Sequence, residues 1–197
     1  GYHSACIGKW HLGWDWPLED AKRFVPSRRN PDPPASDDVK AEWAESFAKP
    51  IAGGPTTRGF NHYFGVDVPN WPPYCWIEDD QVQGTPSEYL PADKLPPEGA
   101  TAPGFGRYRE GMDLSSLPGP ALPGWTFEPL LPTLGDRACQ YVNDRAATEA
   151  PFFLYMPLTS PHTPLAVNDE WKGKSGLNLY ADFVMETDAV VGRVLDT

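Results

Sequence analysis

The placement of proline constrains this chain of 197 residues more than any other feature. Nineteen of its 24 prolines lie between Pro17 and Pro129. Proline removes a backbone N–H donor and is poorly tolerated in helix interiors and central strands. We therefore expect residues 14–130 to form a loop-rich excursion without long helices or central strands. Aromatic side chains are interleaved with these prolines, which indicates that the excursion packs over a core and is not a disordered tether.

The last third of the chain has the pattern of regular α/β structure. Apolar residues at helical spacing predict a helix over about 132–148, and the apolar run 152–156 predicts a central strand buried on both faces. A second helical pattern runs from Tyr180 to Leu195. We expect residues 131–197 to form a helix–strand–helix core on a mostly parallel sheet, with the next strand beyond Thr197.

Basic and imidazole side chains follow two of the predicted strands. Residues 4–7 lead into Lys9 and His11, and residues 152–156 lead into a loop that carries His162. Open parallel sheets place their sites at the carboxyl ends of strands. If both strands belong to one sheet, the three side chains can converge on a compact anion, although each alone would more often be an ordinary surface or loop residue.

The charge of the chain limits its partners. It carries 27 acidic and 16 basic residues, a formal net charge of -11, which disfavours nucleic acids and anionic membranes as partners. No apolar run is long enough for a membrane span. A site for a compact anion would need a local cationic cluster because the bulk charge repels anions at long range. The three cysteines allow one disulfide, and Cys6 is predicted to be a small buried hydrophobic residue.

Three stretches together resemble one family. Residues 1–13, GYHSACIGKWHLG, resemble the second signature of the type I sulfatases, and residues 151–165 look like the strand and histidine loop of bacterial arylsulfatases. Residues 57–65, TRGFNHYFG, are also similar to that family. The resemblance implies an alkaline phosphatase-like α/β fold. Because it begins at residue 1, we expect residues 1–197 to be a partial catalytic domain truncated at both ends.

The resemblance implies an enzyme that hydrolyses sulfate esters of carbohydrates or aryl alcohols. It implies a formylglycine nucleophile and a divalent ion such as Ca²⁺. In the matching positions, Lys9 would bind sulfate oxygens, His11 would act as a base in sulfate release, and His162 would contact sulfate and protonate the leaving oxygen. Family habit suggests a periplasmic or extracellular location.

The sequence departs from the family pattern at the nucleophile. No Cys or Ser is followed by the x-Pro-x-Arg that formylglycine formation requires, and the family's metal ligands cannot be placed. We therefore expect the nucleophile and the metal ligands to lie outside this fragment, assign no metal ligand within it, and expect the isolated fragment to be inactive. Asp79-Asp80 and Asp37-Asp38 imitate the family's acidic pair, but solvated acidic pairs are the more common explanation.

Several other residues have two interpretations. Flat rings suit a sugar or aryl pocket, so Trp71, Tyr74 and Trp76 are candidates for substrate binding, although core packing is the favoured interpretation. His3 and His62 are interpreted as structural.

Two alternative functions stay open from the sequence. One is a phosphoester or phosphonate hydrolase of the same superfamily, and the other is a non-catalytic module that binds sulfated glycans. The residues around Lys9 and His11 favour sulfate over phosphate.

Overall fold

The structure is a computed structural model that describes residues 1–17, 36–95 and 116–197. The parts of the predicted excursion at 18–35 and 96–115 lie outside these described residues. In chain order the described strands and helices are β1 His3–Lys9, α1 Asp37–Phe47, the 3₁₀ helix η2 Pro55–Arg58, β2 His62–Val66, β3 Trp76–Glu78, β4 Gln81–Gln83, β5 Glu88–Leu90, the 3₁₀ helix η3 Ala92–Lys94, β6 Gly119–Ala121, α2 Leu130–Ala146, β7 Phe152–Tyr155 and α3 Leu179–Leu195.

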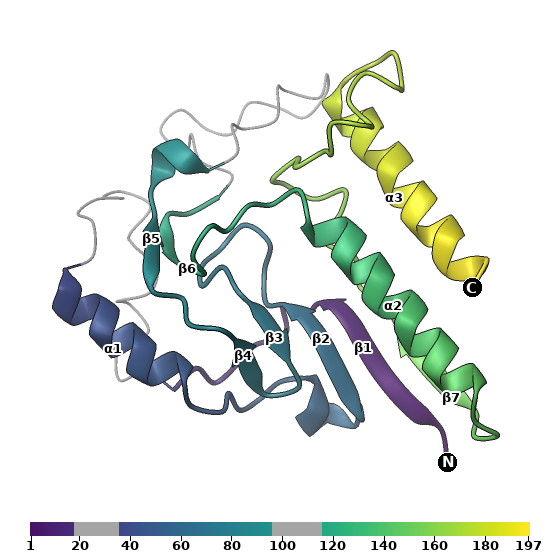
Figure 1. Cartoon of the computed structure of the whole chain (residues 1–197), viewed down its shortest axis with the longest axis horizontal. Coiled ribbons are helices and arrows are strands. Elements are labelled where there is room, and N and C mark those ends of the chain that lie inside the picture. Colours follow the sequence, from purple (N-terminus) through teal and green to yellow (C-terminus); the bar gives the residue numbers. More distant parts are fainter. Residues whose placement is uncertain (18–35, 96–115) are drawn as a thin grey trace.

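The main sheet has five strands in the order β4-β3-β2-β1-β7 (Figure 1). β1 is parallel to both of its neighbours, β2 and β7, whereas β3 is antiparallel to β2 and β4 is antiparallel to β3. Four of the five strands therefore run in the same direction. A separate two-stranded ribbon pairs β5 with β6. The predicted architecture, a mostly parallel sheet flanked by helices, is confirmed.

Both faces of the central strand β1 are covered, and the alternation of its side chains shows how. Ala5 and Ile7 pack against α2, where Leu134 and Ala138 are fully buried. Cys6 points to the opposite face and packs in a second cluster formed mostly by loop residues. This period-two alternation is what a strand buried between two layers requires. All three cysteines are free, so the disulfide that the sequence allowed does not form.

The two long helices are those that the sequence pattern predicted. α2 begins two residues before the predicted start at Pro132, which lies in the first turn where proline is tolerated. α3 packs on α2, on the side away from the main sheet in Figure 1. Its buried residues include the acidic side chains Asp182 and Glu186, whereas Val184 and Leu195 are exposed. The apolar stripe of the sequence therefore only partly describes the buried face of α3.

β7 differs from its prediction as a strand buried on both faces. It lies at the edge of the described sheet, paired only with β1. Phe153 and Tyr155 are 52% and 44% exposed, and both stack loosely on Phe60, with ring centroids 6.5 and 6.1 Å apart. The run of apolar residues predicted the strand and its parallel direction correctly. The prediction that both faces of β7 are buried was wrong for the described residues. Only one face of β7 is covered by a helix.

The expectation that residues 14–130 contain no central strand was also wrong. β2 lies in the middle of the main sheet, and α1 is an eleven-residue helix. Both fall in proline-free windows, between Pro55 and Pro69 and between Pro34 and Pro50. Proline density averaged over a long segment thus concealed two regular elements.

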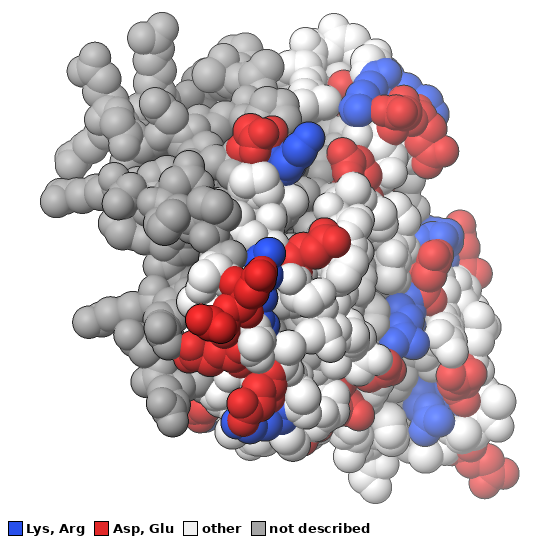
Figure 2. Space-filling model, turned by 60° about the vertical axis from the view of Figure 1, so that its left-hand side comes forward, with Lys and Arg blue, Asp and Glu red and all other residues white. Residues whose placement is uncertain are grey.

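The start of α1 explains the Asp37-Asp38 pair. Ser36 caps the helix by accepting a hydrogen bond from the amide of Val39, and the two aspartates occupy the first turn, where carboxylates interact favourably with the helix dipole. Acidic side chains gather on the side of the molecule that carries α1, with single basic side chains among them (Figure 2). The pair is part of a solvated helix terminus.

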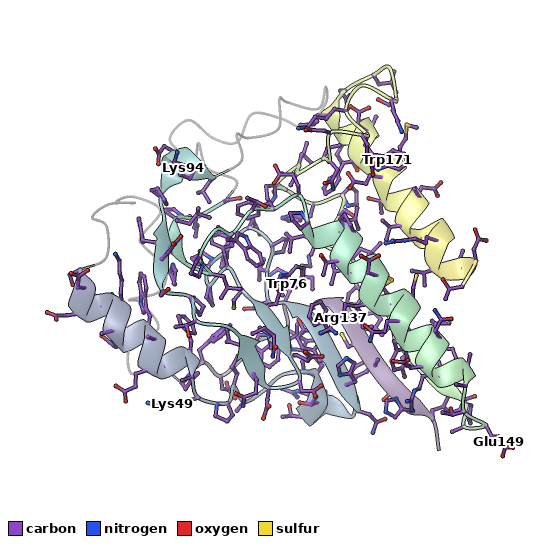
Figure 3. All side chains as sticks on the ribbon, in the orientation of Figure 1. Lys49, Trp76, Lys94, Arg137, Glu149 and Trp171 are labelled. Carbon is purple, nitrogen blue, oxygen red and sulfur yellow. The ribbon has the colours of Figure 1, made fainter. Side chains whose placement is uncertain are left out.

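Arg137 fastens α2 to the sheet. Its guanidinium lies 2.8 Å from the Glu78 carboxylate on β3 and 3.9 Å from the centre of the Phe64 ring on β2. Trp76 stacks on the same Phe64 ring, with centroids 5.1 Å apart and planes 17° apart. Figure 3 shows Arg137 and Trp76 close together where α2 meets the sheet. The ion pair and the cation–π contact thus act at one place.

Replacing Arg137 by Gln should lower the free energy of unfolding by about 1 kcal/mol, because it removes a half-exposed ion pair and a cation–π contact. Urea denaturation of the purified protein measures this. The matched control is Arg58→Gln, which changes an exposed arginine and should leave the midpoint nearly unchanged. Equal effects of the two variants would contradict the assignment.

Candidate active site

The carboxyl ends of β1, β2 and β7 meet at one edge of the sheet. Lys9, the last residue of β1, is in register with Val66, the last residue of β2. The amide of Lys9 donates to the carbonyl of Pro157, two residues after β7, over 2.7 Å. The loop with Lys9 and His11 and the loop with His162 therefore leave the sheet as neighbours. The sequence analysis required both strands to belong to one sheet for Lys9, His11 and His162 to converge, and β1 and β7 do.

Two glycines allow the three backbones to approach this closely. A Cβ atom on Gly8 would lie 2.1 Å from the carbonyl oxygen of Pro157, and one on Gly65 would lie 1.8 Å from the carbonyl oxygen of Gly8. Gly8 also has a φ of 147°, a conformation that side chains rarely adopt. Only glycine fits at these two positions, so the position of Lys9 follows from them.

The segment after β1 is anchored by its central residue. Trp10 is buried, and its indole donates to the carbonyl of Gly13 over 3.2 Å. Its neighbour Lys9 is half-buried, and His11 is exposed. His11 adopts a φ of 53°, and its amide donates to the carbonyl of Asp67 over 3.1 Å. Left-handed backbone at a non-glycine residue is uncommon and often accompanies function.

His162 lies in the exposed part of the loop after β7. Its Nδ1 is 2.7 Å from the carbonyl oxygen of Thr163, and because a carbonyl only accepts, we assign the hydrogen to Nδ1. Nε2 then remains as the ring nitrogen for chemistry. The exposed ring is consistent with a group that meets a ligand.

Side chains of α3 hold the loop that carries His162 in place. The hydroxyl oxygens of Thr187 and Ser160 are hydrogen-bonded over 2.7 Å, and the buried carboxylate of Glu186 accepts from the amide of Asn168 over 3.1 Å. Leu165 and Val167 are buried between these anchors. The position of His162 therefore depends on polar contacts that no sequence pattern indicated.

The aromatic candidates divide by burial. Tyr74 is 2% exposed, and its hydroxyl donates to the carbonyls of Asn70 and Leu117. Trp76 packs between Phe64 and other aromatic rings of the core. Both have the packing role that the sequence favoured. Trp71 is 39% exposed and is the one of the three that a ligand could reach in the described structure.

The remaining histidines lie at the opposite edge of the sheet. His3 begins β1, with its Nδ1 3.0 Å from the Tyr141 hydroxyl. His62 begins β2 and pairs with Asp79 over 3.0 Å, and the same carboxylate accepts from the amide of Tyr63. The Asp79-Asp80 pair therefore holds a hairpin turn, far along the strand from Lys9.

The described residues do not fit a metal site. Among residues 1–17, 36–95 and 116–197, no group of three or more His, Cys, Asp or Glu side chains is placed to hold a metal ion. In the same residues, no helix is both long enough and apolar enough to cross a bilayer.

Asp67 is a site residue that the sequence analysis missed. It follows β2 directly, at the sheet edge that carries Lys9 and His11. Burial raises the pKa of its carboxyl above the ordinary value, whereas the nearby charge of His11, the His11 amide and the Trp16 side chain act in the opposite direction. A carboxylate after an apolar strand was the available signal, but the proline-rich surroundings had placed this strand in a loop.

The chain belongs to the sulfatase family, whose sequence model matches residues 1–197. Arylsulfatase G of Rattus norvegicus is 24% identical over 206 residues, an alignment that covers all of this chain and 30% of that protein. N-acetylgalactosamine-6-sulfatase of Canis lupus familiaris is 23% identical and is matched by 99% of this chain over 27% of its own length. The chain thus spans less than a third of the length of these relatives.

A solved structure shows the same fold. It is a Bacteroides thetaiotaomicron protein described in connection with the metabolism of multiple glycosaminoglycans, and it aligns with a TM-score of 0.63 at 20% identity. The alignment covers all of this chain and 39% of that chain. The alkaline phosphatase-like fold that the sequence implied is therefore confirmed.

Replacing Gly8 by Ala should destabilise the protein by about 2 kcal/mol or more, because the new methyl group meets the Pro157 carbonyl and φ is unfavourable. Thermal or urea unfolding measures the loss. Gly59→Ala is the matched control, because Gly59 has a φ of 102° with nothing within 4 Å of its Cβ position. If both variants lose the same stability, the close approach of the strands is not the cause.

Acid should weaken the hydrogen bonds that hold the loop before α3, because it protonates the Asp182 carboxylate that accepts them. This buried carboxylate accepts from the amides of Ser175 and Gly173, each over 2.8 Å, and hydrogen bonds from Ser175 and Gly173 lower its pKa below the ordinary 3.8. Its contribution to stability is present above pH 3.8 and is lost as the pH falls through the lower folded pKa.

Asp182→Asn should therefore flatten the acid limb of the curve of stability against pH and lower stability at neutral pH. Unfolding curves measured at several pH values test this. Asp188→Asn, an exposed change on the same helix, is the control and should keep the wild-type curve. A wild-type acid limb in the Asp182 variant would rule out the assignment.

Proposed function

We propose that this chain forms part of a sulfatase that hydrolyses sulfate esters. Membership of the family supports the reaction class, and the similarity to N-acetylgalactosamine-6-sulfatase supports a sulfated sugar as substrate, with an aryl sulfate as the simpler analogue. The observation that carries the proposal is the bond from the Lys9 amide to the Pro157 carbonyl, which seats the two histidine-bearing loops side by side.

Lys9 is proposed to bind the sulfate oxygens. Lys9 is a half-buried residue at the end of β1, where partial removal from water strengthens the interaction of a charged side chain with an anion. The acidic chain as a whole repels a sulfate at long range, and the surface in Figure 2 mixes acidic and basic side chains. A local cation is therefore needed to hold the substrate, and it can stabilise the charge that develops on the sulfate oxygens.

The two histidines are proposed to handle protons. His162 contacts the sulfate and, in its doubly protonated imidazolium form, donates the Nε2 proton to the leaving oxygen and becomes the neutral ring with its hydrogen on Nδ1. His11 accepts a proton from a hydroxyl at the reacting centre when sulfate is released. Exposed Trp71 is proposed to contact the organic part of the substrate through its flat ring.

The nucleophile and the metal are proposed to come from chain outside these 197 residues. The sulfatase family generally uses a formylglycine nucleophile and Ca²⁺, which supply the attack on sulfur and the neutralisation of its charge. The chain has no Cys/Ser-x-Pro-x-Arg motif, and its described residues hold no cluster suited to a metal. Following the habit of the family, we propose a location in the periplasm or outside the cell.

The test is turnover of an aryl sulfate and the matching aryl phosphate by the full-length protein, produced with a formylglycine-generating enzyme. We expect the sulfate to be preferred. Lys9→Ala, His11→Ala and His162→Ala should each lower kcat/KM by about 10²- to 10⁴-fold, the range typical of lost charge stabilisation or proton transfer.

The controls are Lys49→Ala, an exposed lysine outside the site, and His62→Gln, at the other edge of the sheet. Both should retain wild-type turnover. Preference for the phosphate would support the phosphoester hydrolase instead, and tight binding of sulfated glycan without turnover would support a binding module.

A further inference from the structure

We propose that Asp67 is the residue that positions His11 for its role as a base, an inference that rests on the proposed function. Asp67 comes first after β2, and His11 comes two residues after β1, so the pair bridges the ends of two neighbouring parallel strands. Asp67 acts through His11 and is not itself in contact with the reacting atoms.

The backbone supplies the first part of the argument. The parallel pairing of β1 with β2 continues beyond the strands, through a bond from the Trp10 amide to the Val66 carbonyl over 3.0 Å and one from the His11 amide to the Asp67 carbonyl over 3.1 Å. His11 has a φ of 53°, which a non-glycine residue holds only when its surroundings fix it. Its bond to Asp67 is the described contact that fixes it.

The side chain of Asp67 supplies the second part. The His11 amide and the Trp16 side chain donate hydrogen bonds to the Asp67 carboxylate, and the charge of His11 interacts favourably with it. The other titratable groups that sense Asp67 are the Cys75 thiol and the Tyr63 hydroxyl, both buried and both disfavoured in their charged forms by it. Among these groups, His11 is the one that gains from a negative neighbour.

The carboxylate has a chemical consequence for the base. When the imidazole of His11 accepts a proton, the O–H bond of the donor breaks, an N–H bond forms, and the ring becomes a cation. A carboxylate nearby stabilises that cation, which is one of the roles of the acid in a catalytic triad. The contribution belongs to the step in which the proton moves, so it should appear in kcat and not in KM.

Stability separates a positioning residue from a structural one. Burial raises the pKa of the Asp67 carboxyl. A carboxyl whose folded pKa is raised favours folding below its unfolded pKa and opposes folding above its folded pKa. Once ionised, Asp67 therefore lowers stability, and Asp67→Asn should not lower the Tm at pH values above the folded pKa of Asp67. A residue kept for structure alone would show the reverse.

The experiment compares wild type, Asp67→Asn and the control Asp144→Asn, an exposed change on α2, in the full-length protein with an aryl sulfate. Asp67→Asn should lower kcat by about 10- to 100-fold, the range seen when an orienting hydrogen-bond partner is lost, with little change in KM. The ratio of wild-type to variant kcat should fall toward one as the pH is lowered, because Asp67 in the wild type then takes up a proton. Asp144→Asn should behave as wild type.

Amide NMR of the same proteins tests the contact without relying on activity. The His11 amide resonance should move as Asp67 titrates in the wild type, and this movement should vanish in Asp67→Asn. The inference would be overturned if Asp67→Asn left kcat unchanged. It would also be overturned if the ratio of wild-type to variant kcat did not depend on pH and the variant had a lower Tm. An inactive wild type would instead count against the proposed function, and the amide titration would then decide the inference alone.

Discussion

The close approach of three parallel backbones at Gly8, Gly65 and Pro157 is the constraint on which the rest of the structure depends. No side chain fits between them, since a Cβ atom on Gly8 or Gly65 would lie only 2.1 or 1.8 Å from a carbonyl oxygen, far inside van der Waals contact. The buried Tyr63 hydroxyl lies 3.0 Å from the Gly8 carbonyl and 2.9 Å from that of Val66, which ties the ends of β1 and β2 together. The two functional loops leave the sheet side by side because of this junction.

Local charge in this protein opposes its bulk charge. The chain carries a net charge of -11, yet Lys9 and two histidines leave neighbouring strand ends at one sheet edge. Asp67 places a negative charge beside His11 at the same edge, where burial works against ionisation. Asp67 is a polar group that is unfavourable for folding and lies beside a candidate catalytic base. This arrangement is expected when a residue serves function and not stability.

The missed strand β2 and the missed residue Asp67 share one cause. Proline content was averaged over residues 14–130, although β2 occupies a proline-free window in the centre of the sheet. The loss of β2 from the predicted core also concealed Asp67, which follows it. β7 was correctly predicted as a parallel strand, but its burial was overestimated because burial depends on which layers cover each face. In α3, Asp182 and Glu186 are buried through hydrogen bonds to loop amides that a hydrophobic pattern does not contain.

The sequence by itself determined the class of fold, the two long helices, the strands that end at Lys9 and before His162, and the family to which the chain belongs. These features depend on local periodicity and on short motifs, which a linear sequence displays. Tertiary structure alone decided that β1 lies between β2 and β7, that Tyr74 is buried in the core with Trp76 packed against it, and that Asp67 meets His11. Such contacts join residues up to 149 positions apart, as between His3 and Phe152, and only the pairing of strands brings them together.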